Sequence, residues 1–185
     1  MVGGMNTLIA LLAAASMMTG SPFTLTSSGF QNRTVLSTTY EFDGMSCTGH
    51  DVSPPLHWSG VPAGTKSFAL TVHDPDAKAP GGWWHWVVLN IPASADGLKA
   101  AAGGGDFSTA PTGTVEGTTS FGKPGYGGPC PPVGSGVHHY IFTLYALDVA
   151  QLPGASKATT GPALTELLSK HLLGEATLVG LFSRP

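Results

Sequence analysis

The stretch HHYIFTLYAL, residues 138–147, decides the fold class of this 185-residue chain. Successive side chains of a strand point to opposite faces of its sheet, and here both sets of side chains are largely apolar. One set is Tyr140, Phe142, Leu144 and Ala146, and the other is Ile141, Thr143, Tyr145 and Leu147. A strand with two apolar faces is typical of a sheet that is covered on both sides. The stretch therefore predicts a central strand.

Outside this stretch, strand patterns dominate the chain. Three further segments have the alternation or the aromatic and β-branched content of strands, namely residues 67–73, 85–91 and 177–183. One helix is predicted between Pro162, which suits a helix start, and Gly174, which suits a helix end. Its apolar stripe consists of Leu164, Leu167, Leu168 and Leu172. These elements predict a mainly β fold, an antiparallel β-sandwich with a peripheral helix.

The composition limits the classes of protein and partner. Hydrophobic residues make up 42% of the chain, which argues against disorder. There are only 8 Lys and Arg residues, the formal net charge is −3, and the chain contains no basic run. A nucleic acid is therefore not an expected partner. The length suits a single domain, which we place at residues 21–185.

The first 20 residues resemble a secretory signal. Residues 8–18 are apolar, but they are fewer than the roughly 20 residues that span a bilayer, so no stable membrane span is expected. No Lys or Arg precedes this run, so an ordered N-terminal helix or a misplaced start codon is the alternative. We expect an exported protein, periplasmic or secreted, which would be cytoplasmic if the segment is not a signal.

The chain contains two cysteines, Cys47 and Cys130, which lie 83 positions apart in loops rich in Gly and Pro. Export would permit them to form a disulfide, and closing so long a loop would contribute about 3–5 kcal/mol in the chain-entropy model. Two separate buried thiols are the alternative.

Acidic side chains follow one predicted strand directly, at Asp74-Pro75-Asp76. Pro75 favours an extended Asp74, and the period of two would then place both carboxylates on one side. Two carboxylates so close need cations or donors beside them. The alternative is a turn in which each Asp accepts from nearby backbone N–H groups.

Aromatic side chains surround His85 in the segment GGWWHW, residues 81–86. Tryptophans can form a pocket wall, and a histidine changes its charge near neutral pH. A buried aromatic cluster around a hydrogen-bonded His85 is the alternative.

A loop with many Gly and Pro residues, 126–136, precedes the central strand. Its glycines would let a ligand approach the backbone and would offer N–H groups to an anion, although a plain connecting loop is the alternative. At the start of the strand, His138 and Tyr140 face the same way and His139 faces the opposite way. We therefore expect His138 and Tyr140 to share a pocket and His139 to lie outside it.

These groups lie at the ends of predicted strands, beside aromatic walls, as a site for a small ligand requires. The competing class is an enzyme that uses Asp, His and Tyr for acid–base or metal-assisted hydrolysis. No HExxH motif is present, and no recognisable motif pairs a Ser or Cys nucleophile with a base. We therefore expect a binding protein with no catalytic residue, no metal and no cofactor.

Two long blocks resemble the signature blocks of the phosphatidylethanolamine-binding proteins, and most closely those of the bacterial branch described as Raf-kinase-inhibitor-like. They are DPDAKAPGGWWHWVVLNIP, residues 74–92, and YGGPCPPVGSGVHHYIFTLYALD, residues 126–148. The block SCTGHDVSPPLHW, residues 46–58, and the tail, residues 172–184, are also similar to that branch. The resemblance extends over residues 23–184.

The resemblance implies a Greek-key β-sandwich with short peripheral helices and a pocket for phosphate-like anions or phospholipid headgroups. It implies pocket roles for Asp74, Asp76, Trp83, His85, Gly128, Pro131, His138 and Tyr140. It also brings the loops of Cys47 and Cys130 together, which favours the disulfide, and it implies a homodimer. Inhibition of a kinase or a protease is a further expectation, with no target indicated.

The expected mechanism is charge matching. His85 and His138, with Tyr140, would hold a phosphoryl or carboxylate group, while Asp74 and Asp76 would orient the histidines or bind a ligand ammonium. We therefore expect phosphate affinity to weaken as the pH rises through the titration of the histidines.

Three residues depart from the family pattern. Lys78 replaces a proline of the first block, His139 replaces an arginine of the second block, and Asp51 replaces a common asparagine upstream. Lys78 would soften the rim of the pocket or add a charge beside it, the group that pairs with the family's arginine has no such partner in His139, and Asp51 would change a hydrogen bond of its loop.

Overall fold

Strand β10 (His138–Leu147) lies inside a six-stranded sheet, between β6 (Ser67–Asp74) and β11 (Leu172–Phe182). Both neighbours are antiparallel to it. The complete order is β2-β11-β10-β6-β7-β9, with β2 (Thr34–Val35), β7 (Trp83–Pro92) and β9 (Val115–Glu116). The prediction of a central strand over these residues is confirmed.

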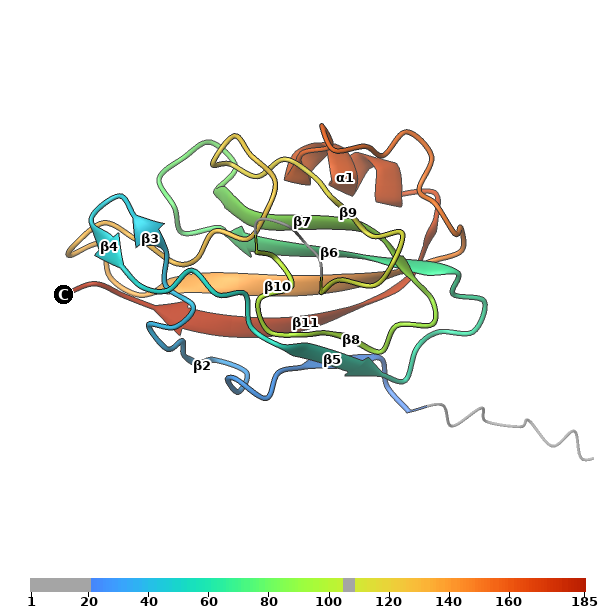
Figure 1. Ribbon diagram of the computed structural model, residues 1–185, viewed down its shortest axis with the longest axis horizontal. Coiled ribbons are helices and arrows are strands. Elements are labelled where there is room, and N and C mark those ends of the chain that lie inside the picture. Colours follow the sequence, from blue (N-terminus) through green and yellow to red (C-terminus); the bar gives the residue numbers. More distant parts are fainter. Residues whose placement is uncertain (1–20, 105–108) are drawn as a thin grey trace, which may run out of the picture.

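A second, three-stranded sheet packs against the first. It has the order β1-β5-β8 and consists of β1 (Thr24–Thr26), β5 (Leu56–Ser59) and β8 (Gly97–Leu98). The main core lies between the two sheets and includes Phe142 and Leu144 of β10 and Trp58 of β5. The helix α1 (Gly161–Leu168) covers part of the opposite face of the larger sheet, beside β7, so the predicted sandwich with a peripheral helix is confirmed (Figure 1).

The computed structural model describes residues 21–104 and 109–185. The predicted signal segment, residues 1–20, lies outside the described residues. Within the described residues, no helix is long and apolar enough to cross a bilayer.

The predicted end of the helix is wrong. The helix begins after the N-cap Thr160 and ends at Leu168, so that Leu172 and Gly174 belong to β11. Leu172 pairs with Leu147, and Gly174 pairs with Ala146, across the sheet. Because these ladder contacts join distant parts of the chain, the local leucine spacing could not reveal them. The last strand consequently begins five residues before its predicted start.

A β-bulge in β7 shapes the interior of the sandwich. Val72 of β6 pairs with Trp86 and His73 pairs with Trp84, so His85 has no partner in β6. A bulge inserts one unpaired residue and can redirect its side chain. The adjacent side chains of His85 and Trp86 consequently both face the interior of the sandwich, where the His85 ring lies 5.0 Å from that of Tyr140. Strict alternation would have placed His85 on the helix side.

Candidate functional site

A cavity of about 300 Å³ opens at the end of the larger sheet where β6 ends and β7 and β10 begin. Histidine, tyrosine and aspartate side chains line it together with aromatic, proline and aliphatic side chains. The lining residues are Met45, Asp74, Ala77, Lys78, Ala79, Trp83, His85, Phe121, Cys130, Pro131, Pro132, His138 and Tyr140. Such a volume suits a small ligand.

Six of the eight residues implied by the resemblance line this cavity. They are Asp74, Trp83, His85, Pro131, His138 and Tyr140. The other two, Asp76 and Gly128, do not line it. Asp76 bonds to His139, and the N–H of Gly128 donates to Asp51 Oδ1 over 2.7 Å, so this N–H is not free for an anion.

His138 and Asp74 form a buried pair. Nδ1 of His138 lies 2.7 Å from Oδ2 of Asp74, and both side chains are 4% exposed. The second carboxylate oxygen, Oδ1, accepts the N–H of Asp76 over 2.9 Å. Asp74 therefore makes the hydrogen bond of an Asx turn, the alternative given above, and also orients His138. Both oxygens of Asp74 already have partners within the protein.

His139 and Asp76 form a parallel but exposed pair. Nδ1 of His139 lies 2.8 Å from Oδ2 of Asp76, and both side chains are 40% exposed. Partial burial by itself would raise the pKa of Asp76. The hydrogen bonds from the ring and the N–H of His139 lower it by a larger amount, so the pKa of Asp76 lies below its ordinary value. His139 faces away from the cavity, as the alternation of β10 predicts.

The ring of His85 is held by the Gly-rich loop. Its Nδ1 lies 2.6 Å from the carbonyl oxygen of Gly127, and the N–H of Gly127 donates in turn to the carbonyl oxygen of His85. Burial lowers the pKa of His85 to about 4. His85 is therefore neutral at neutral pH, and the predicted pH dependence of anion binding does not come from this residue.

Tyr140 presents a free hydroxyl group. Its side chain is buried, and its Oη has no hydrogen-bond partner among the described residues. Burial, and next the charge of Asp74, raise the pKa of Tyr140, so that the phenol keeps its proton. A buried hydroxyl without a partner costs free energy, and a ligand that accepts its hydrogen would recover that cost.

One wall of the cavity is a short hairpin made of β3 (Asp43–Gly44) and β4 (Cys47–Thr48). Its two turn residues, Met45 and Ser46, have φ of 51° and 68°, values that non-glycine residues rarely adopt. The disulfide between Cys47 and Cys130, with a Cα–Cα distance of 5.9 Å, attaches the hairpin to the Gly-rich loop. The structure thus contains the disulfide that the resemblance favoured.

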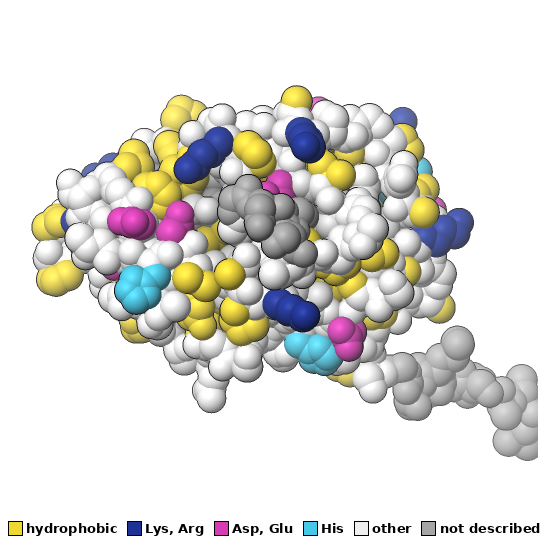
Figure 2. Space-filling model, in the orientation of Figure 1, with side chains coloured by type: hydrophobic (Ala, Val, Ile, Leu, Met, Phe, Trp, Pro, Cys, Tyr) yellow, Lys and Arg dark blue, Asp and Glu magenta, His cyan; other side chains and the backbone are white. Residues whose placement is uncertain are grey.

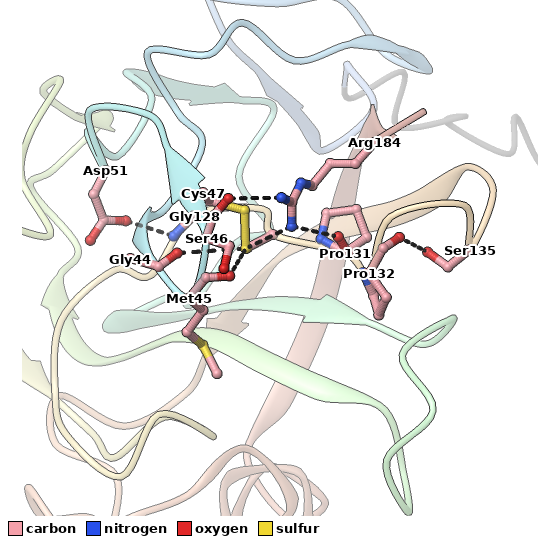
Figure 3. Close-up of a disulfide and its surroundings, with 11 residues drawn as sticks. Gly44, Met45, Ser46, Cys47, Asp51, Gly128, Pro131, Pro132, Ser135 and Arg184 are labelled. Carbon is pink, nitrogen blue, oxygen red and sulfur yellow. Dashed lines mark hydrogen bonds between the residues drawn. A yellow bond between two sulfur atoms is a disulfide. The ribbon is translucent and has the colours of Figure 1, made fainter.

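Arg184, just beyond β11, holds the same wall from the other side (Figure 3). Its guanidinium group donates to the carbonyl oxygen of Ser46 over 2.7 Å and to that of Pro131 over 3.4 Å. The strained turn therefore has both a covalent and a hydrogen-bonded attachment. Together they hold the turn that carries Met45, one of the residues that line the cavity.

Comparison with known proteins identifies the family. Residues 26–183 match the sequence model of the family described as phosphatidylethanolamine-binding protein. The chain belongs to this family. Among its relatives, the UPF0098 protein YbcL of Escherichia coli is 42% identical over 160 residues, which cover 86% of this chain and 87% of YbcL. The putative lipoprotein LppC of Mycobacterium tuberculosis is 45% identical over 74% of this chain and 63% of its own length.

Solved structures of the phosphatidylethanolamine-binding protein family have the same fold. The crystal structure of YbcL matches with a TM-score of 0.85 and 41% identity, covering 88% of this chain and 99% of that one. A homologue from Chlamydia trachomatis matches with a TM-score of 0.73 and 32% identity over 88% of this chain and 98% of its own. The expected family and sandwich fold are therefore confirmed.

The three departures from the phosphatidylethanolamine-binding protein pattern have distinct surroundings. His139 bonds to Asp76, outside the cavity. Asp51 accepts the N–H of Gly128, and partial burial raises the pKa of Asp51. Lys78 is exposed at the rim of the cavity, where it places a positive charge.

Gly128, which the resemblance gave a pocket role, has a packing role in the structure. A β-carbon at this position would overlap the backbone of residues 40–42, so only glycine fits there.

Sequence reasoning missed several residues of the site. Met45 and Phe121 line the cavity, and Ser135 lies 3.0 Å from Nε2 of His138. Phe121 belongs to a long irregular segment without periodicity, and Met45 belongs to a hairpin that the disulfide and Arg184 attach to the site. Only Ser135 had a signal in the sequence, namely its position in the loop three residues before His138.

Proposed function

We propose that this member of the phosphatidylethanolamine-binding protein family binds a small anionic ligand that also has an apolar part. The ligand lies in the cavity that Met45 and Tyr140 line, and the protein does not change it chemically. The observation that carries this proposal is the unpartnered hydroxyl group of Tyr140 inside a cavity with largely apolar walls. Its hydrogen has no acceptor among the described residues, but Oη is enclosed, so a ligand oxygen reaches it only when the surrounding side chains shift. The side chains of Trp83 and Phe121 line the same cavity and are placed to contact an apolar group.

An anion suits the site better than a zwitterion. The carboxylate of Asp74 is engaged by His138 and by the N–H of Asp76, and the carboxylate of Asp76 is engaged by His139. Both oxygens of Asp74 thus have partners, and Asp76 does not line the cavity, so neither carboxylate is placed to pair with the ammonium of a ligand in the cavity. Lys78 at the rim adds a positive charge. Of the expected charge matching, we therefore keep the binding of an anionic group and drop the binding of a ligand ammonium by Asp74 and Asp76.

Replacing Tyr140 with phenylalanine tests the proposal. The variant should bind phenyl phosphate roughly 10- to 100-fold more weakly, because a hydrogen bond to a charged group contributes about 1.5–3 kcal/mol. Its free energy of unfolding should be unchanged or higher, since the lost hydroxyl has no partner in the protein. Calorimetric titration and urea denaturation measure the two quantities. Unchanged affinity would contradict the proposal.

One observation favours a hydrolase as a second candidate. Ser135 Oγ lies 3.0 Å from His138 Nε2, and His138 Nδ1 lies 2.7 Å from Asp74 Oδ2, the spacing of a nucleophile, a base and an orienting acid. Two observations weigh against it. Ser135 does not line the cavity, and its hydroxyl also lies 2.7 Å from the carbonyl oxygen of Pro132, to which it donates in a tight turn.

Hydrolysis of 4-nitrophenyl acetate separates the two candidates. We expect the unmodified protein and a Ser135→Ala variant to hydrolyse this ester at the same low rate. A rate that falls more than about 100-fold in the variant would establish Ser135 as a nucleophile and favour the hydrolase.

Metal-assisted hydrolysis has no support from the arrangement of side chains. Over residues 21–104 and 109–185, no three His, Cys, Asp or Glu side chains converge as metal ligands.

On the face shown in Figure 2, the Lys and Arg side chains are scattered and form no single basic patch. A small ligand remains the proposed partner.

Export is supported by two observations. The disulfide between Cys47 and Cys130 is typical of oxidising compartments, and the relative from Mycobacterium tuberculosis is named a putative lipoprotein. We therefore propose that residues 1–20 direct export and are removed from a domain that begins at residue 21. N-terminal sequencing of the protein recovered from its cells tests this, and an intact Met1 would refute it.

A further inference from the structure

The outer edge of β11, on the side away from β10, has backbone groups without a partner (Figure 1). Val179 shows which groups face this edge, because its N–H donates to Asn32 Oδ1 over 2.9 Å and its carbonyl oxygen accepts the N–H of Arg33 over 2.6 Å. Residues two apart in a strand direct their backbone groups to the same edge, so the N–H and C=O groups of Glu175 and Thr177 also point outward. The short strand β2 pairs with β11 only beyond Val179. Among the described residues, no hydrogen-bond partner reaches the backbone of Glu175 or Thr177 on this side.

A groove of about 540 Å³ lies beside this free edge, and its other wall is β1, the outer strand of the smaller sheet. Leu25 of β1 lies opposite Trp58 of β5, but the N–H of Trp58 donates to Asp96 on the β8 side. The backbone groups of Leu25 therefore point away from β5 and toward the groove. The groove thus lies between the unpaired edges of both sheets. Its lining residues are Phe23, Thr24, Leu25, Thr26, Ser27, Phe30, Gln31, Asn32, Glu175, Ala176, Thr177 and Leu178.

The free edge lacks the usual protection against pairing with another chain. Natural sheets protect exposed edges with Lys or Pro residues or with a β-bulge. The segment GEATL, residues 174–178, contains neither Lys nor Pro, and its register with β10 is regular. Free N–H and C=O groups at regular strand spacing are complementary to one more extended backbone. The chemistry of this edge therefore suits a peptide strand.

The side chains of β11 indicate what such a strand should carry. Ala176 and Leu178 point into the core between the sheets. Glu175 and Thr177 are exposed on the other face, and Glu175 is the only charged residue that lines the groove. Because neighbouring residues of paired strands share a face, a residue opposite Glu175 would meet its carboxylate, and the residues on either side would face inward, toward Phe23. A basic residue flanked by apolar residues fits this pattern.

We propose that the free edge of β11 is a second binding site of this protein, which takes up an extended peptide segment of another protein as an additional strand. The segment carries a Lys or Arg residue opposite Glu175 and apolar residues on either side of it. The outward N–H and C=O groups of Glu175 and Thr177 form the backbone hydrogen bonds. The groove and the cavity described above share no lining residue, so the peptide site is independent of the ligand proposed for the cavity.

The probe is a short acetylated and amidated peptide in which lysine and threonine residues alternate with valines. Only alternate N–H groups of an added strand point toward β11, so methylation of backbone nitrogens provides matched controls. One control peptide is methylated on the valine nitrogens, and the other is methylated on the lysine and threonine nitrogens. All three peptides have the same side chains. By calorimetric titration, one methylated peptide should bind like the unmethylated peptide and the other at least about tenfold more weakly, because it has lost the N–H donors that face β11.

Variants of two residues locate the peptide on the protein. Thr177→Pro removes an N–H that has no partner in the fold, and it should weaken binding of the unmethylated peptide at least about tenfold. Thr177→Val keeps the N–H and is the matched control, which should leave the affinity unchanged. Glu175→Lys should weaken binding of the lysine peptide roughly two- to fivefold, and it should strengthen binding of a peptide with glutamate in place of lysine.

Three outcomes would overturn the inference. Equal affinities for the two methylated peptides would show that the peptide does not pair with a strand edge. A homodimer that Thr177→Pro converts into monomers, as measured by sedimentation, would show that a second copy of this chain occupies the edge. No binding of the unmethylated peptide, by protein that still binds phenyl phosphate, would refute the peptide site and leave the proposed cavity ligand standing. The methylated peptides decide the question on the unmodified protein even if Thr177→Pro fails to fold.

Discussion

Replacing His138 with alanine is expected to abolish binding of phenyl phosphate and to lower the free energy of unfolding by about 3–5 kcal/mol. His138 is the partner of Asp74 at 2.7 Å, and both side chains are 4% exposed. Without the imidazole, the buried carboxylate of Asp74 keeps only the N–H of Asp76 as a partner and lies against the cavity. That carboxylate would repel an anionic ligand as well as destabilise the fold.

The neighbouring pair of His139 and Asp76 provides a matched control. Its Nδ1–Oδ2 distance is 2.8 Å, nearly the same, but both side chains are 40% exposed. His139→Ala should cost less than about 1 kcal/mol, because solvent screens exposed ion pairs, and should leave ligand affinity unchanged. Urea denaturation and calorimetric titration of the two variants measure these effects. Equal losses from both variants would show that burial and facing do not distinguish the two histidines.

A double variant separates the two causes of the His138→Ala defect. Adding Asp74→Asn removes the unpaired charge while leaving the cavity without its imidazole. The double variant should regain part of the lost stability, since a neutral amide is less costly to bury than a carboxylate. No recovery at all would show that the His138→Ala defect comes from the lost packing of the imidazole and not from the unpaired buried charge of Asp74.

Removing the disulfide should have an effect of similar size. A bond across 83 positions restricts the unfolded chain by about 4 kcal/mol in the chain-entropy model, so Cys47→Ser with Cys130→Ser should lower the free energy of unfolding by about that amount. Ligand affinity should fall too, because Met45 lines the cavity from the hairpin that this bond attaches. Urea denaturation and titration with phenyl phosphate measure the two losses.

Reduction of the unmodified protein is the control for the cysteine variant. A thiol reductant should lower its stability toward that of the double serine variant and should leave the variant unaffected. Arg184 still holds Ser46 and Pro131 after reduction, so the hairpin should remain folded under native conditions. If titration of free thiols shows complete reduction and the stability is unchanged, the disulfide does not stabilise this protein.

Much of the site follows from local chemistry. The alternation of β10 was sufficient to place His138 and Tyr140 together and His139 apart, because successive side chains of any strand point to opposite faces. The position of Asp74 at a strand end was likewise visible. The role of Gly128 was not visible in the sequence. Its N–H donates to Asp51, and this hydrogen bond is recognised only once both loops have been placed in the fold.

The residues of the chain were sufficient for a mainly β fold with a central strand at 138–147, for the family, and for six cavity residues, because side-chain alternation and signature blocks are properties of neighbouring residues. Only the tertiary structure decided the length of the helix, the inward turn of His85 and the approach of Met45 and Ser135. Each of these depends on pairing between distant segments: β10 with β11, β6 with the bulged β7, and the hairpin with the Gly-rich loop. Such pairing is set by the register and closure of the whole sandwich, which no local pattern contains.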